Sequence, residues 1–199
     1  MIRRTWIARL FAAAVAAVAV SGSAQAGIIP ASVTVTPEAG NFRWTYSIVL
    51  PTDMKLQAGN YFTIYDFGGL VSGSITAPTD WSISSTNSGP VPTGLNPNDD
   101  ANVPNLTFTY TGATIPTGQL GLGNFWAVST QGDSTTVSFT AQNPQASTGN
   151  LDRNIVNTIA PIVPGGGGNQ TGVPEPATLA LAGLGLPFVG AARLLRRKK

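Results

Sequence analysis

Residues 27–162 alternate apolar and polar side chains with a period of two, and this pattern restricts the possible folds more than any other feature. In RWTYSIVL (43–50), for example, every second side chain is a large apolar one. Short segments of the same kind, rich in β-branched and aromatic residues, recur between turns of Gly, Pro, Asn and Asp. They are 32–36, 61–67, 70–75, 81–86, 105–111, 124–130, 135–141 and 154–160. With no convincing 3.6-residue period, the sequence predicts an all-β fold, a single antiparallel β-sandwich with a jelly-roll-like arrangement as the alternative.

This predicted domain has to be stabilised without disulfide bonds, because the sequence contains no Cys. A domain of about 136 residues can do so, since chains near this size bury about two-thirds of their unfolded surface. Gly68 and Gly69 lie between two predicted strands and predict a tight hairpin. The polar, proline-containing segment 87–105 predicts a long exposed loop at one end of the sandwich.

The N-terminal 26 residues have the organisation of a secretory signal peptide. Three arginines precede the apolar run LFAAAVAAVAV (10–20), and the small residues Ala24 and Ala26 occupy the positions that signal peptidases require. We therefore predict export and cleavage before Gly27. An uncleaved N-terminal anchor is the alternative.

The C-terminal region predicts a tether and a membrane segment. A Gly-rich linker (163–172) leads to VPEP, and residues 177–192 form an uncharged apolar run. Sixteen helical residues rise only about 24 Å, against a hydrocarbon core of about 30 Å, so the span is marginal and suits a temporary anchor. An ordinary uncut anchor is the alternative. The basic residues that would keep the C-terminus in the cytoplasm are Arg193, Arg196, Arg197, Lys198 and Lys199.

The charge distribution argues against a nucleic-acid partner. The whole chain has a formal net charge of +2, but eight of its eleven basic residues lie in the two terminal segments. Residues 27–172 hold three basic and eight acidic residues, a net charge of −5. No clustered Lys/Arg surface is available there for phosphate binding.

The C-terminus resembles the PEP-CTERM protein-sorting signal of exopolysaccharide-producing Gram-negative bacteria. The resemblance covers residues 173–199: the motif Val173, Pro174, Glu175 and Pro176, then one apolar span, then a terminal basic cluster. It implies processing by an exosortase, a membrane enzyme, after transient membrane anchoring. It further implies delivery to the cell surface or extracellular matrix.

Catalysis and metal binding find little support in the sequence. Without His or Cys, triads that need those residues are impossible, and no G-x-S-x-G motif occurs. We therefore predict no enzyme activity, no cofactor and no metal. A calcium loop at Asn96, Asn98, Asp100 and Asn102 is a weak alternative, because the positions expected for Gly and Glu hold Ala101 and Thr107. A glycosidase needs two carboxylates, and seven aspartates could supply them, although we interpret them more simply as turn residues. They are Asp53, Asp66, Asp80, Asp99, Asp100, Asp133 and Asp152.

Aromatic residues supply the remaining candidate site. Strand alternation places Tyr61, Tyr65 and Phe67 on one face and Phe62 on the other, so both faces cannot line one core. With Trp126 they could form an exposed platform that stacks on sugar rings, although we favour a second cluster covered by a loop. Three functions follow, in this order: a structural protein of the surface or exopolysaccharide matrix, a carbohydrate-binding module, and a carboxylate-based glycosidase.

Overall fold

The alternation predicted for residues 43–50 becomes a strand with one buried face. The computed structural model describes residues 27–118 and 120–163, which belong to one compact unit ending at Gly166. In strand β2 (Asn41–Leu50), Trp44, Tyr46 and Ile48 are at most 1% exposed, whereas the residues between them are partly exposed. Burial of every second side chain is therefore what fixes the orientation of this strand.

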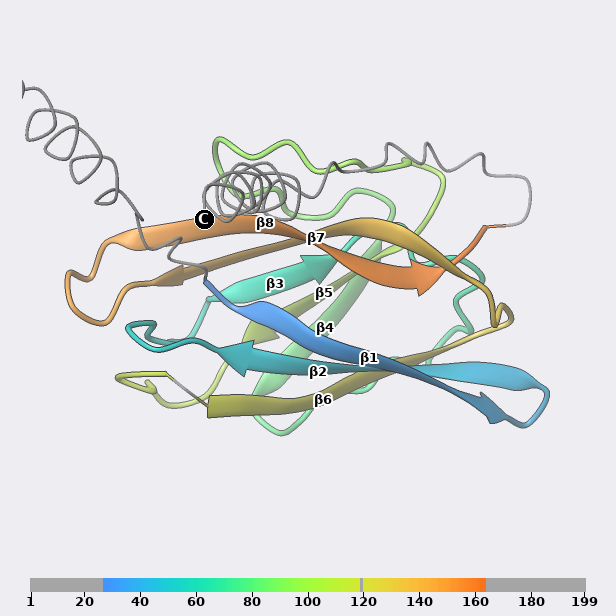
Figure 1. Ribbon diagram of the computed structural model, residues 1–199, viewed down its shortest axis with the longest axis horizontal. Helices are drawn as coiled ribbons and strands as arrows, with labels where there is room; N and C mark the ends of the chain where they lie inside the picture. Colours follow the sequence, from blue (N-terminus) through green and yellow to red (C-terminus); the bar gives the residue numbers. More distant parts are fainter. Residues whose placement is uncertain (1–26, 119, 164–199) are drawn as a thin grey trace, which may run out of the picture. The chain divides into compact units, whose positions relative to one another are not determined.

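The described residues form eight strands in two antiparallel sheets, with no α-helix among them. The order is β1-β2-β6 in one sheet and β4-β5-β3-β7-β8 in the other. The sheets lie face to face (Figure 1), as in a β-sandwich, and confirm the predicted all-β class. The remaining strands are β1 (Ile29–Glu38), β3 (Tyr61–Ile64), β4 (Trp81–Thr86), β5 (Asn105–Tyr110), β6 (Leu120–Ser129), β7 (Ser134–Pro144) and β8 (Leu151–Pro161).

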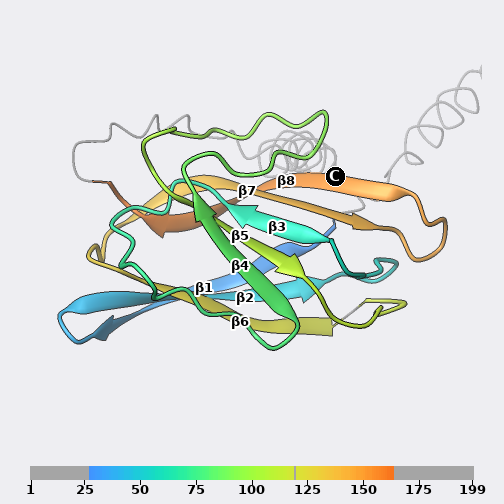
Figure 2. The same cartoon turned by 180° about the vertical axis from the view of Figure 1, so that it is seen from behind.

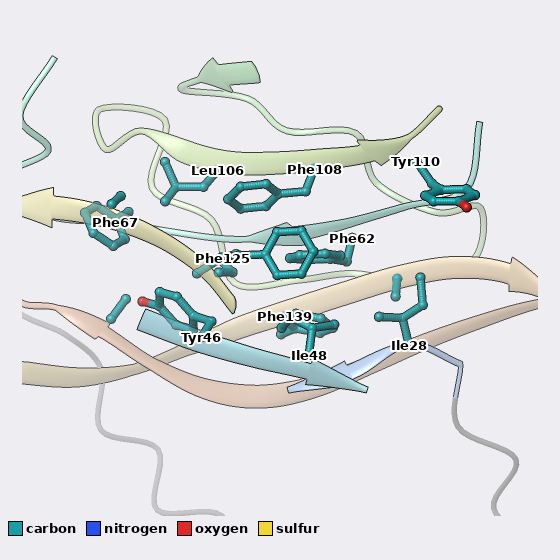
Figure 3. Close-up of a cluster of buried hydrophobic side chains, with 14 of the residues drawn as sticks. Ile28, Tyr46, Ile48, Phe62, Phe67, Leu106, Phe108, Tyr110, Phe125 and Phe139 are labelled. Carbon is teal, nitrogen blue, oxygen red and sulfur yellow. The ribbon is translucent and has the colours of Figure 1, made fainter. Parts of the chain in front are cut away.

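Aromatic rings fill the space between the sheets (Figure 3). Phe62 on β3 lies at the centre, with ring centroids 5.0 Å from Phe108, 4.9 Å from Phe125 and 5.3 Å from Phe139. Phe125 comes from the three-stranded sheet and meets the Phe62 ring edge to face at 86°. Such pairs contribute about 0.5–1.5 kcal/mol each beyond their buried area, so this cluster joins the two sheets without a disulfide.

The two glycines predicted to form a hairpin have a different role, so that prediction is wrong. Gly68 donates its N–H to Pro161 O at 3.2 Å, and a Cβ atom there would lie 2.6 Å from Ile162 O. Gly69 has φ of +60°, which side chains rarely adopt, and its carbonyl accepts a hydrogen bond from Thr130 N. The glycines therefore allow the chain to leave one sheet and approach the other.

The segment 70–75 was predicted as a strand and is irregular instead. It follows the free edge of β6, where Val71 N donates to Val128 O at 2.9 Å. Thr76 and Trp126 then exchange two backbone hydrogen bonds of 2.7 and 3.0 Å. Gly73, at φ +75°, and the turn around Ser74 interrupt the strand geometry, so the segment covers the edge without extending the sheet.

The long loop is mostly exposed, as predicted, but it covers a face of the five-stranded sheet and does not extend from one end of the sandwich. Figures 1 and 2 both show this segment, between β4 and β5, crossing the outer side of that sheet. Its backbone is bonded to the sheet: Asn98 N donates to Ser138 Oγ at 2.9 Å, and Pro90 O accepts from Tyr65 Oη at 3.0 Å. The loop thereby gives the sheet a second buried side.

Candidate functional site

Two of the four rings predicted for a sugar-binding platform are buried. Tyr65 and Phe67 both have a relative exposure of 0%. Asp66 between them has φ of +51°, which breaks the strand alternation and turns Phe67 into the central core, where it meets Trp44 edge to face at 6.5 Å. The alternative of an exposed four-ring platform is therefore not formed, and the reason is a local backbone conformation that the period-two pattern does not reveal.

Tyr65 belongs instead to a polar layer under the long loop, the arrangement that we favoured over an exposed platform. Its hydroxyl donates to Pro90 O and lies 3.2 Å from Thr140 Oγ1. On the neighbouring pair of strands, Thr63 Oγ1 and Thr107 Oγ1 are 3.0 Å apart. Burial raises the pKa of Tyr65, so its hydroxyl stays protonated and available as a donor at neutral pH.

Trp126 lies on the outer face of the three-stranded sheet and is partly exposed. It pairs with Thr45 in the register of β2 and β6, and the neighbouring outward positions on β1 and β2 hold Ser and Thr. The Arg43 guanidinium carbon lies 4.0 Å from the ring centroid, so a cation covers one side of the indole. Tyr61, the fourth predicted ring, is partly exposed on the other sheet.

A hydrogen-bonded ion pair fixes the arginine beside this ring. Arg43 Nη2 donates to Glu38 Oε1 at 2.7 Å, and Arg43 Nε donates to the second carboxylate oxygen. Those hydrogen bonds hold the pKa of Glu38 below its usual value. Arg43 was not among the predicted site residues, because its position over Trp126 depends on the register between β2 and β6.

Three of the seven candidate aspartates come together at the base of the long loop. Asp100 N donates to Asp66 Oδ1 at 2.8 Å, and Asn105 bridges Asp66 N and Asp99 Oδ1 with two bonds of 2.8 Å. Burial raises the pKa of Asp66, and the charges of Asp99 and Asp100 raise it further. The carboxylates thus tie the loop to the sheet. The other four, Asp53, Asp80, Asp133 and Asp152, lie on separate turns and strands.

The weak calcium alternative falls within this same loop. Both nitrogens of Asn102 donate to Asp100 Oδ1, at 3.0 Å from the backbone and 2.9 Å from the side chain. Among residues 27–118 and 120–163, no group of three or more His, Cys, Asp or Glu side chains is placed to hold a metal ion. Of the four side chains that the sequence singles out, Asp100 thus accepts hydrogen bonds from within the loop itself.

A polar cluster that sequence reasoning did not identify surrounds Gly27. Asn143 on β7 and Asp152 and Asn154 on β8 direct side-chain oxygens toward this residue. Asp152 was considered only as a carboxylate for catalysis, and the two asparagines were not considered. Only the pairing of β7 with β8, which places Asn143 opposite Asp152, brings the three together.

The predicted processing residues other than Gly27 lie outside the described residues. These are Ala24 and Ala26, the motif Val173–Pro176, the apolar run 177–192 and the basic residues from Arg193 to Lys199. Within the described part of the chain, no helix has the length and apolar character needed to cross a bilayer.

Comparison with known proteins identifies the C-terminal segment. No curated protein matches the chain. One family model does match, over residues 172–198, which agrees within one residue at each end with the predicted boundaries of 173 and 199. That model describes the PEP-CTERM protein-sorting motif, so the chain ends in the sorting signal of an exported, membrane-anchored precursor that an exosortase processes.

Proposed function

We propose that this protein is a structural component of the cell surface or exopolysaccharide matrix of a Gram-negative bacterium. The observation that carries the proposal is the PEP-CTERM motif at residues 172–198, only about ten residues after the last strand. A sorting signal placed there delivers one folded β-domain to the outside of the cell. Residues 27–172 carry a net charge of −5. Because like-charged domains repel one another, this charge favours a soluble protein spread through an extended network over a membrane-bound form once the tail has been removed.

The packing of the domain supports a structural role. Its large aromatic rings are used mainly inside the sandwich, where Phe62, Phe108, Phe125 and Phe139 are each at most 1% exposed. The acidic cluster beneath the long loop accepts hydrogen bonds from backbone N–H groups and from Asn105. These side chains connect the loop to the sheet, and a domain without disulfides suits a matrix in which no particular redox state is maintained.

The sorting step follows from the sequence around Glu175. A residue before proline is disfavoured in the helical region, so the sequence predicts that Glu175 is extended and accessible to an enzyme. The basic residues at the C-terminus keep that end in the cytoplasm, which places the motif at the outer surface of the membrane. Cleavage by an exosortase near the motif then releases the domain from its temporary anchor.

Intact-mass analysis of the extracellular protein tests this function. We expect a species that begins at Gly27 and ends near Val173–Pro176, or a heavier one if the new C-terminus is joined to another molecule. Glu175→Ala, or loss of the exosortase, should leave residues 193–199 attached and the protein in the membrane fraction. Glu38→Ala, which changes the other glutamate of the chain, is the matched control and should be processed normally. Extracellular protein that still carries Lys199 would contradict the proposal.

A carbohydrate-binding role is the second candidate, and the position of Trp126 is the observation that favours it. The ring is partly exposed on a sheet face whose neighbouring side chains are mainly Ser and Thr hydroxyls. An indole beside hydroxyl groups and Arg43 could stack on a sugar ring if the guanidinium moved aside. The third candidate, a glycosidase, has only the cluster of Asp66, Asp99 and Asp100 in its favour, and hydrogen bonds to these carboxylates connect the loop to the sheet.

A further inference from the structure

Gly27, the first described residue, is buried against the end of the β7–β8 pair. A Cβ atom added to it would lie 2.6 Å from Asn143 Oδ1, 2.8 Å from Asn154 Oδ1 and 3.5 Å from Asp152 Oδ2. A side chain at this position would displace the amide oxygens of Asn143 and Asn154. With glycine, the three oxygen atoms can lie close to the backbone of residue 27.

Two of these oxygens lack a hydrogen-bond donor. Asn143 Oδ1 accepts from Ile28 N at 2.9 Å, and Asn154 Nδ2 donates to Ile28 O at 3.1 Å. Asp152 Oδ2 and Asn154 Oδ1, in contrast, are buried and have no hydrogen-bond partner. Buried acceptors without a donor are rare in proteins and costly, most of all when one belongs to a carboxylate.

The missing group should be a donor with positive charge. Carboxylate and amide oxygens accept hydrogen bonds, so their complement is a cation that carries several N–H groups. In the precursor the nitrogen of Gly27 is a peptide nitrogen with one hydrogen, and that hydrogen reaches neither oxygen. A free α-amino group at the same position would carry three hydrogens and a positive charge at neutral pH.

We propose that the α-ammonium group created by cleavage before Gly27 binds Asp152 and Asn154 and completes the fold at this end of the sandwich. Hydrolysis adds the elements of water across the Ala26–Gly27 bond, leaving a carboxylate on Ala26 and an amine on Gly27, which takes up a proton. The new ion pair then holds Ile28, which is 0% exposed, in the core. Removal of the leader is thereby coupled to the stability of the domain. The proposal depends on the predicted cleavage site and is independent of any role in the matrix.

Chemical labelling of the N-terminal amine tests the proposal directly. Two chains would be prepared from a removable fusion and purified in detergent, one from Gly27 to Lys199 and one that begins at Ala26. An acylating reagent is added at pH 7, and labelling of the N-terminal peptide is followed by mass spectrometry. We expect the amine of Gly27 to react at least tenfold more slowly than that of Ala26, because only the first is held by Asp152.

Two variants and a stability measurement complete the test. Asp152→Asn should accelerate labelling of Gly27 at least tenfold, whereas Asp133→Asn, which removes an exposed carboxylate before β7, should not change it. The chain that begins at Gly27 should also unfold at a higher temperature than the one that begins at Ala26. The two chains contain the same hydrogen-bond acceptors, so this comparison changes only the position of the amine. Equal labelling rates for Gly27 and Ala26 would overturn the proposal. The proposal would also be overturned if the amine of Gly27 were labelled as slowly in Asp152→Asn as in the wild type.

Discussion

Removal of one hydroxyl group, by the substitution Tyr65→Phe, should separate the two roles considered for the aromatic residues of the segment 61–67. The Tyr65 side chain is buried beneath the long loop, and its hydroxyl bonds both Pro90 O at 3.0 Å and Thr140 Oγ1 at 3.2 Å. Phenylalanine keeps the ring and its packing. The substitution therefore tests only the link between the sheet and the loop, which a solvent-exposed sugar platform would not need.

The expected loss of stability follows from the two groups left behind. A hydrogen bond contributes about 0.5–1.5 kcal/mol net, and a buried group deprived of its partner costs about 1–3 kcal/mol. Thr140 is 0% exposed, whereas Pro90 is exposed, so its carbonyl can accept a hydrogen bond from water instead. We therefore expect the free energy of unfolding to fall by about 1 kcal/mol, which for a domain of this size corresponds to a decrease in Tm of roughly 3–5 °C.

Thermal unfolding followed by circular dichroism provides the first measurement, and proteolysis provides the second. Thermolysin should cut the loop at Leu95 faster in Tyr65→Phe than in the wild type, because the loop opens more often. Tyr61→Phe is the matched control, since Tyr61 begins β3 four residues before Tyr65, is partly exposed, and its hydroxyl has no hydrogen-bond partner among the described residues. Equal Tm values and equal cleavage rates for the two variants would refute the reasoning.

Two other predictions concern the acidic cluster and the exposed indole. Burial raises the pKa of Asp66, so the folded state binds its proton more tightly than the unfolded state, and the charged form lowers stability above about pH 4. Asp66→Asn, which keeps the acceptor for Asp100 N, should be more stable than the wild type at pH 7, and the difference in Tm should disappear near pH 3; a difference independent of pH would contradict this. If the carbohydrate-binding alternative holds, Trp126→Ala should abolish retention of the protein on extracted matrix glycan, with Tyr61→Ala as control. Equal retention of Trp126→Ala and the wild type would exclude that face as the binding site.

The sequence was sufficient to predict the strands whose orientation depends on local alternation. Segments 43–50, 81–86 and 135–141 all lie within strands β2, β4 and β7. The sorting signal could also be predicted from the sequence, because its residues are consecutive and act as a linear motif. In both cases the information lies in neighbouring residues, so no knowledge of distant contacts was needed.

The errors arise where one residue changes the path of the chain. Asp66 adopts φ of +51°, and from that point the period-two assignment puts Phe67 on the wrong face. Such a conformation is uncommon for a residue other than glycine and is stabilised here by the distant Asn105, whose Oδ1 accepts from Asp66 N. Thirty-nine residues separate the two partners, so no local pattern contains the information.

The cluster around Gly27 could not be predicted from local sequence patterns either, because its residues are far apart in the chain. It also gives structural information about a residue that the sequence identifies only as part of a cleavage motif. The sequence identifies Gly27 as the residue after a cleavage site through its small neighbours Ala24 and Ala26. The structure independently favours glycine at that position, because a Cβ atom there would displace the side-chain oxygens of Asn143 and Asn154. Both observations concern one residue, although the first involves the leader that is removed and the second the domain that remains.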